Sequence, residues 1–203
     1  MDCNMENTRN IKMIVAYDGT NYHGWQRQKN GITVQEVLES VLSEMFGKET
    51  VVTGCSRTDA GVHARIYVCS FKGNTTIPTD KIPFVLNTKL PEDIRVYKCE
   101  EAPEEFNARF HTVTKAYEYK IVNRAFQDPL LRNFAWHYPI ELDVEKMKRA
   151  AEIIKGKHDF ASFCAAGSVV KSTVRNLTEL SVKKDGDIIT VRAAADGFSP
   201  IEA

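Results

Sequence analysis

The sequence has no long run of apolar residues. Of its 203 residues, 43% are hydrophobic and 27% are charged. No segment approaches the roughly 18 consecutive apolar residues that a membrane-spanning helix needs. The first ten residues, MDCNMENTRN, lack the apolar centre of a secretory signal peptide. We therefore expect a globular chain that has no membrane partner and is located in the cytoplasm.

Paired cysteines are also missing. The five cysteines are Cys3, Cys55, Cys69, Cys99 and Cys164. An odd number without a Cys-x-x-Cys pair argues against a disulfide framework and against a structural zinc, so we interpret them as reduced thiols. His158 and Asp159 lie near Cys164, but one residue of each type at these spacings forms no recognised set of zinc ligands. The sequence predicts no metal site.

A net charge is absent as well, because 27 basic residues balance 27 acidic ones. A neutral chain is not the usual form of an RNA-binding protein. The charges are segregated, however: residues 107–176 carry a net charge of +5 and residues 76–106 a net charge of −3. A basic segment can follow phosphates even in a neutral protein. A solvated surface of mixed sign explains the charges equally well, so both interpretations stay open.

The first half of the chain alternates strand and helix patterns. We expect strands over residues 11–17, 50–53, 66–72 and 94–98, and helices over 33–46 and 79–88. Thr33 with Glu36 resembles a capping box, and Gly47 is a typical helix end. In the strand over 66–72, Tyr67, Cys69 and Phe71 share one face. The order β-α-β-β-α-β is the ferredoxin-like pattern.

The second half begins the same pattern again. We expect a strand over 115–123, a helix over 143–154, and strands over 176–183 and 188–193 joined at Asp185-Gly186. A further helix and strand should follow, but Ser199-Pro200 interrupts a helix there and the sequence ends at Ala203. We expect an α+β fold of two ferredoxin-like halves, residues 1–106 and 107–203, that share an antiparallel sheet, the second half being incomplete.

The segment with the clearest chemistry is Ser56-Arg57-Thr58-Asp59-Ala60-Gly61-Val62-His63-Ala64. It places the Asp59 carboxylate in a tight turn, two residues after Arg57. A neighbouring guanidinium favours the ionised carboxylate, and a positioned carboxylate can act as a nucleophile. Asp and Gly are also common turn residues, so Asp59 and Gly61 alone would indicate only a turn between two strands.

Three further segments carry aromatic and polar residues in patterns that suit RNA. In Phe106-Asn107-Ala108-Arg109-Phe110, Arg109 stands between two phenylalanines, and Tyr117 follows on a predicted strand. Such residues can stack on bases and contact phosphates, although Tyr117 could equally be an ordinary aromatic of a sheet. Residues 17–28 place aromatics and amides beside a turn. In the segment from His158 to Phe163, we expect Phe160 and Phe163 to pack in the core.

Together these segments resemble the TruA family of tRNA pseudouridine synthases, in order and spacing, over almost the whole chain. The family's usual active-site string is G-R-T-D-A-G-V-H-A, from which only Ser56 departs. The resemblance implies isomerisation of uridines in the tRNA anticodon stem-loop, at tRNA positions 38–40, by a homodimer that needs no cofactor and no catalytic metal. It implies that Asp59 is the nucleophile, and that Arg57 pairs with Asp59 and helps to extrude the nucleotide. It also implies that Tyr117 stacks on the base and assists removal of its C5 proton, while Arg109 contacts the RNA.

The resemblance ends near Phe198, where family members continue with a helix whose arginine reaches the catalytic carboxylate. Because that arginine has no counterpart here, a second hypothesis is a truncated paralogue that binds RNA but is catalytically impaired. A third is a simple ferredoxin-like RNA-binding module. Residues 65–71 lack the glycines of the usual RNA-binding strand, which makes the third hypothesis the weakest.

Overall fold

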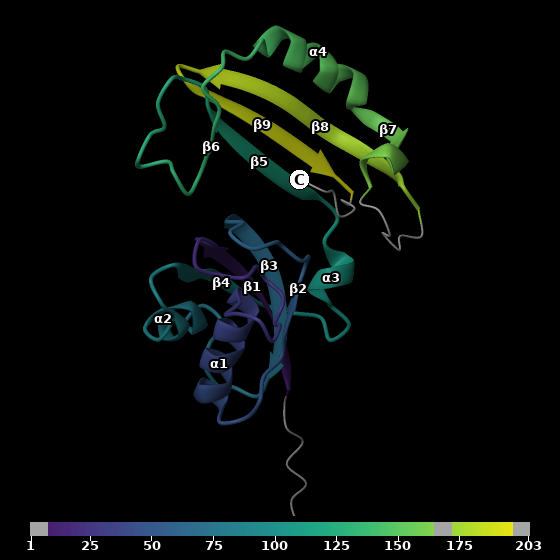
Figure 1. Cartoon of the computed structure of the whole chain (residues 1–203). Coiled ribbons are helices and arrows are strands. Elements are labelled where there is room, and N and C mark those ends of the chain that lie inside the picture. Colours follow the sequence, from purple (N-terminus) through teal and green to yellow (C-terminus); the bar gives the residue numbers. More distant parts are fainter. Residues whose placement is uncertain (1–7, 165–171, 197–203) are drawn as a thin grey trace, which may run out of the picture. The chain divides into compact units, whose positions relative to one another are not determined.

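The computed structural model describes residues 8–164 and 172–196, and it divides the chain into two compact units, Met1–Thr112 and Val113–Ala203 (Figure 1). Residues 197–203, where the sequence predicts an interrupted helix, lie outside the described residues. No helix in the described ranges is both long and apolar enough to span a membrane. Each unit is described by itself.

The first unit is a four-stranded antiparallel sheet with helices. Its strands are β1 (Arg9–Tyr17), β2 (Val52–Gly54), β3 (Ala64–Gly73) and β4 (Ile94–Ala102). Their order in the sheet is β2-β3-β1-β4, and β1 pairs antiparallel with both β3 and β4. The helices α1 (Val34–Phe46) and α2 (Ile82–Asn87) occupy the two crossovers, and the short α3 (Ala108–His111) follows β4. The predicted ferredoxin-like order of this half is confirmed.

Local signals explain where α1 begins and ends. The Thr33 side chain accepts a hydrogen bond from the Glu36 main-chain nitrogen at 3.3 Å, which caps the first turn. Gly47 adopts a left-handed conformation, with φ of 66°, directly after the last turn. The helix buries Val34, Leu38 and Leu42. The helix therefore packs its apolar side against one face of the sheet and forms part of the core.

The core of the first unit joins α1, α2 and one face of the sheet. The buried side chains include those predicted for one face of β3, namely Tyr67, Cys69 and Phe71. The described cysteines are free, and burial raises the pKa of the Cys99 thiol to about 12. A buried thiol of raised pKa is a packing residue and not a nucleophile.

The second unit has a five-stranded sheet in the order β6-β5-β9-β8-β7. Its elements are β5 (Lys115–Val122), β6 (Trp136–His137), α4 (Val144–Ile154), β7 (Gly156–Asp159), a short 3-10 helix (Ala161–Phe163), β8 (Val174–Asp185) and β9 (Ile188–Ala195). The predicted hairpin is present: β8 and β9 pair antiparallel, and Asp185 lies opposite Ile188 next to the turn. The strand β6 pairs parallel with the end of β5.

The α+β class with two similar halves is confirmed, and the described strands form one sheet within each unit. A sheet shared by the two halves stays a prediction. Three edge strands, β2, β6 and β7, have only three, two and four residues, so they offer few main-chain groups for further pairing. Phe163, expected in the core, is 53% exposed, because its segment forms a short 3-10 turn with no buried residue.

Candidate active site

Two loops of the first unit form a surface pocket around Asp59. The pocket has a volume of about 520 Å³ and is open to solvent. Its lining residues are His23, Gln26, Gln28, Arg57, Thr58, Asp59 and Ala60. The first three come from the loop after β1, and the others come from the loop between β2 and β3. The structure therefore brings together residues 17–28 and the Asp59 segment, which the sequence presents as separate patterns.

Main-chain hydrogen bonds join the two loops. The Trp25 nitrogen donates to the Thr58 oxygen at 3.1 Å, and the Gly61 nitrogen donates to the Tyr22 oxygen at 3.2 Å. The Asp59 oxygen accepts from the Val62 nitrogen at 3.2 Å, which closes the turn. The backbone on both sides of Asp59 is thus fixed, while its carboxylate remains exposed in the pocket.

Glycine permits the close approach of these loops at two positions. A Cβ atom on Gly24 would lie 2.2 Å from the Thr58 oxygen, and the φ of Gly24 is +79°. A Cβ atom on Gly19 would lie 2.1 Å from the Val62 oxygen. Neither distance is compatible with a side chain, so any other residue would push the Asp59 turn away from the first loop.

Three buried aromatic rings that contact one another support the pocket from the core. The Trp25 ring stacks on Tyr67 with ring centroids 4.0 Å apart, and Tyr17 meets Tyr67 at 5.7 Å. The Tyr67 hydroxyl donates to the Ser56 main-chain oxygen, and the Tyr17 hydroxyl lies 3.0 Å from the Thr58 hydroxyl. Burial raises the pKa of Tyr67, so this phenol is a fixed donor. The aromatic cluster thereby ties the core to both sides of Arg57.

His63 and Asp18 form a polar contact at the end of the Asp59 turn. The His63 Nδ1 atom lies 2.9 Å from an Asp18 carboxylate oxygen and 3.1 Å from the Gly19 nitrogen. Partial burial acts to raise the pKa of Asp18, but hydrogen bonds from Thr20 and the nearby His63 lower it by more. The ionised Asp18 therefore helps to hold the first loop against His63.

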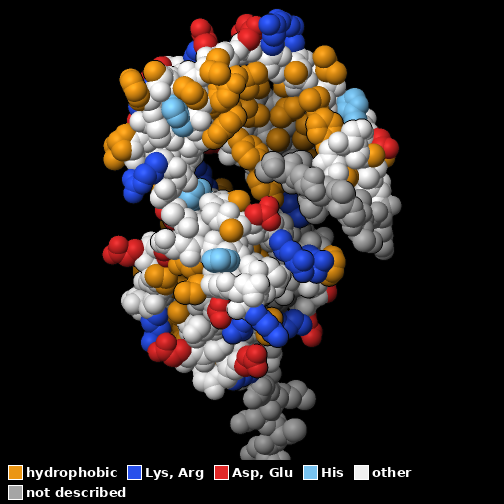
Figure 2. Space-filling model, in the orientation of Figure 1, with side chains coloured by type: hydrophobic (Ala, Val, Ile, Leu, Met, Phe, Trp, Pro, Cys, Tyr) orange, Lys and Arg blue, Asp and Glu red, His pale blue; other side chains and the backbone are white. Residues whose placement is uncertain are grey.

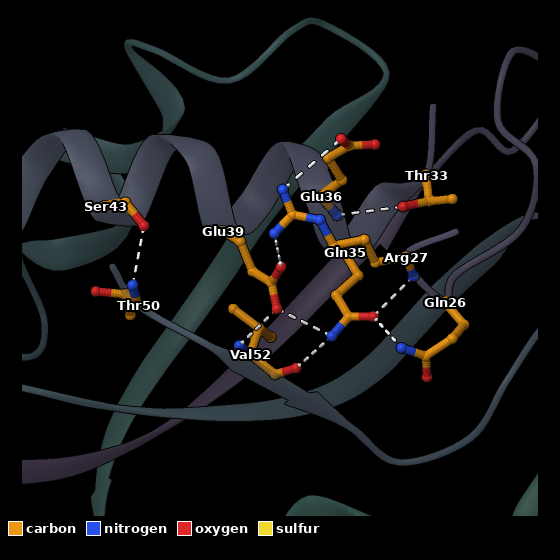
Figure 3. A network of polar contacts seen from close by, with 9 residues as sticks. All are labelled: Gln26, Arg27, Thr33, Gln35, Glu36, Glu39, Ser43, Thr50 and Val52. Carbon is orange, nitrogen blue, oxygen red and sulfur yellow. Dashed lines mark hydrogen bonds and ion pairs between the residues drawn. The ribbon is translucent and has the colours of Figure 1, made fainter. Parts of the chain in front are cut away.

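A buried polar network lies behind the pocket on the α1 side (Figure 3). The Glu39 carboxylate accepts hydrogen bonds from Arg27 at 3.0 Å, from the Gln35 side chain at 2.9 Å and from the Val52 nitrogen at 3.1 Å. Gln35 and Glu39 are 7% and 6% exposed, although they lie on a helix of mainly apolar core residues. The network continues to Gln26, which lines the pocket.

The predicted site residues fall into two groups. Arg57 and Asp59 line one pocket, although no ion pair between them is recorded among the described residues, so their pairing stays a prediction. Arg109 is exposed on α3 of the first unit, with its guanidinium 5.8 Å from the Phe110 ring. Tyr117 belongs to β5 of the second unit, opposite Ala193 on β9. Sequence reasoning alone did not assign His23, Gln26 and Gln28 to the site, although it singled out their segment.

The chain matches a family model described as tRNA pseudouridine synthase over residues 13–111 and 150–199. It is 47% identical over 190 residues to tRNA pseudouridine synthase A of Thermoanaerobacter sp. (strain X514), and this match covers 94% of the chain and 78% of the relative. The proteins of the same name from Clostridium acetobutylicum and Ruminiclostridium cellulolyticum are 44% and 46% identical, over the same shares of both chains.

Proposed function

Because the chain belongs to the tRNA pseudouridine synthase family, we propose that it converts uridine to pseudouridine in the anticodon stem-loop of tRNA, at tRNA positions 38–40. The observation that carries this proposal is the exposed Asp59 carboxylate, fixed by main-chain hydrogen bonds in an open pocket that it shares with Arg57. The pocket of about 520 Å³ has room for a nucleoside-sized group.

The proposed reaction is an isomerisation. The bond between uracil N1 and ribose C1′ breaks, and a bond between C5 and C1′ forms. C5 loses a proton and N1 gains one, so atoms and electrons balance without an oxidant, a reductant or another co-substrate. In the proposed route the nucleophile bonds to C1′ as the N1–C1′ bond breaks, and it leaves as the C5–C1′ bond forms. The site therefore needs a nucleophile, a group that accepts the C5 proton, and residues that hold the detached base.

Asp59 is the nucleophile in this proposal. Its carboxylate is exposed in the pocket, while the backbone on both sides is anchored to Trp25, Tyr22 and Val62. A nucleophile held in this way meets the substrate with little further loss of entropy. The fixed turn is the feature that prepares Asp59 for reaction.

Arg57, Tyr117 and Arg109 have supporting roles. Arg57 lines the same pocket and is exposed, so it can fill the space that an extruded nucleotide leaves in the RNA. Tyr117, half-buried on β5, stacks on the base and assists removal of the C5 proton. Arg109 is exposed and contacts an RNA phosphate. The partner is tRNA, the protein acts as a homodimer, and it works in the cytoplasm.

An Asp59→Asn variant tests the proposal. The change keeps the size of the side chain and removes its charge, so pseudouridine formation should fall by at least about three orders of magnitude. Release of tritium from tRNA labelled at uridine C5 measures the rate, and a filter-binding titration measures RNA affinity, which should stay within about threefold. An Asp80→Asn variant, altered at an exposed carboxylate outside the pocket, should react at the parent rate. Tritium release from Asp59→Asn at the parent rate would refute the role of Asp59.

A further inference from the structure

We propose that Gln26 and Gln28 determine which nucleotide the pocket accepts, because their amide oxygens are held ready to accept hydrogen bonds from donor groups of a bound ribonucleotide. This inference rests on the proposed function, since it assumes that the pocket around Asp59 receives a nucleotide. It assigns a role to two pocket residues that take no part in the proposed bond-making steps.

The orientation of the Gln35 amide is the first step of the argument. Its nitrogen donates to the Glu39 carboxylate and to the Val52 main-chain oxygen, each at 2.9 Å. Its oxygen accepts from the Arg27 main-chain nitrogen at 2.9 Å. Both partners of the nitrogen are acceptors only, and an Arg27 N–H is a donor only. A flipped Gln35 amide would break all three hydrogen bonds in a buried site, so only one orientation is possible.

The orientation of Gln26 follows from that of Gln35. The Gln35 oxygen can only accept, so Gln26 must approach it with its amide nitrogen, which it does at 2.6 Å. The Gln26 oxygen then points away from Gln35, as Figure 3 shows. No hydrogen bond to this oxygen is recorded from the part of the chain that the structure describes. Gln26 is exposed and lines the pocket, so its oxygen is available to a ligand.

Gln28 reaches the same arrangement through a different contact. Its amide nitrogen donates to the His23 main-chain oxygen at 2.6 Å. A carbonyl oxygen is an acceptor only, so the Gln28 amide must approach it with its nitrogen, and no hydrogen bond to the Gln28 oxygen is recorded among the described residues. Each of the two glutamines thus uses one of its two amide N–H groups within the protein and keeps its amide oxygen available to a ligand.

This pattern of acceptors selects the chemistry of the ligand. A phosphate offers only acceptor oxygens, so the amide oxygens of Gln26 and Gln28 cannot hydrogen-bond it, although Arg57 in the same pocket can. A ribonucleotide offers donors in its 2′-hydroxyl and, for uridine, in the base N3–H. Both groups can meet an amide oxygen, and a site built to hydrogen-bond a donor rejects an analogue that lacks it. The glutamines should thus favour a ribose over a deoxyribose or an N3–H over an alkylated base.

The test is a cycle of protein and RNA changes, measured as dissociation constants of the full chain. An Asp59→Ala background prevents conversion of the RNA. Anticodon stem-loop RNA carries uridine, 2′-deoxyuridine or 3-methyluridine at the target position. For the Asp59→Ala protein, the RNA analogue that lacks the relevant donor should bind about fivefold more weakly than the uridine RNA. When Gln26→Met or Gln28→Met is added to Asp59→Ala, the same analogue should bind less than about twofold more weakly than the uridine RNA. The RNA analogue that shows the coupling identifies the donor as ribose or base.

A glutamine in the second unit provides the matched control. Gln127 also donates its amide nitrogen to a main-chain oxygen, that of Ala135, but lies outside the pocket. Gln127→Met should leave both RNA discriminations unchanged. Unchanged discrimination in Gln26→Met and Gln28→Met for both analogues would overturn the inference. If that result accompanies normal pseudouridine formation by the parent chain, the inference fails and the proposed function stands. If the glutamine substitutions do reduce the discrimination but the parent chain forms no pseudouridine, the inference stands and the proposed reaction is refuted.

Discussion

The first unit buries most of the aromatic rings next to the candidate site, whereas the second unit exposes many of its aromatic side chains. The two tryptophans of the chain illustrate the contrast: Trp25 is 1% exposed and Trp136 is 63% exposed. A large connected cluster of buried apolar residues lies in the first unit, while the described part of the second unit buries a smaller set that includes Ile121, Val122 and Ile189. In the second unit, α4 buries only Ala151 among its residues, and Figure 2 shows apolar side chains gathered on the visible face of that unit.

This difference explains why the candidate site lies where it does. A reactive carboxylate must be held in place, and the Asp59 turn is supported by the aromatic cluster, two glycines and the Glu39 network, all within the densely packed unit. The second unit has broader apolar exposure and exposed basic residues, which suit contact with a large partner. The contrast predicts that equivalent substitutions will have unequal effects in the two units.

The largest difference is expected for the two tryptophans. Trp25→Ala should destabilise the first unit by about 3–5 kcal/mol, because it leaves a cavity beneath the pocket and removes the stack on Tyr67. Trp136→Ala should change stability by less than about 0.5 kcal/mol. Urea unfolding followed by far-UV circular dichroism measures both. Equal effects of the two substitutions would remove the contrast between the units.

The next largest effect concerns carboxylates. Glu39→Ala leaves the Val52 N–H without its buried acceptor and removes one of the two acceptors of the Gln35 amide nitrogen, so it should cost about 2–3 kcal/mol. Glu145 forms an exposed ion pair with Lys148 on α4, and Glu145→Ala should cost less than about 0.5 kcal/mol. Thermal unfolding of the two variants beside the parent chain provides the comparison; a Glu39→Ala chain as stable as the parent would show that the network does not support the fold.

A third comparison uses two glycines with positive φ. Gly186 turns the β8–β9 hairpin with nothing near its Cβ position, so Gly186→Ala should cost only about 1 kcal/mol of backbone strain. Gly24→Ala adds a clash with Thr58 and should cost up to about 3 kcal/mol. It should also reduce pseudouridine formation at least about tenfold, because the Asp59 turn must shift. Gly24→Ala with unchanged activity would show that the close contact of the loops is not needed.

The smallest effect is a dependence on pH. The pKa of Asp18 is lowered in the folded state, so ionised Asp18 stabilises the fold above its ordinary value of 3.8, and this contribution is lost as the pH falls below that value. Asp18→Asn should therefore weaken the fall in melting temperature between pH 5 and pH 3. Asp143 also has a lowered pKa, through hydrogen bonds from Lys146 at the start of α4, so Asp143→Asn is the counterpart in the second unit. An unaltered pH profile in Asp18→Asn would contradict the stabilising role of its hydrogen bonds from Thr20 and its contact with His63.

Features set by neighbours in sequence were predictable. The ends of α1 follow from Thr33 and Gly47, and the hairpin follows from the turn after Asp185. The face of β3 that carries Tyr67 follows from simple alternation. In each case the determining contacts lie within a few residues, which is why a single sequence contains the signal.

Features that depend on distant partners were not predictable. Gln35 and Glu39 on α1 resemble ordinary helix polar residues until Arg27 and Val52 are brought beside them. His23, Gln26 and Gln28 are joined to Asp59 only when two loops meet at Gly24.

The central claim is that Asp59, held by the first unit, performs the chemical step. Single-turnover conversion of tRNA with excess protein measures that step apart from binding and product release. The account predicts that Asp59→Asn binds the tRNA but forms no pseudouridine on the time scale on which the parent chain completes a turnover. Conversion by Asp59→Asn at the parent single-turnover rate would contradict it.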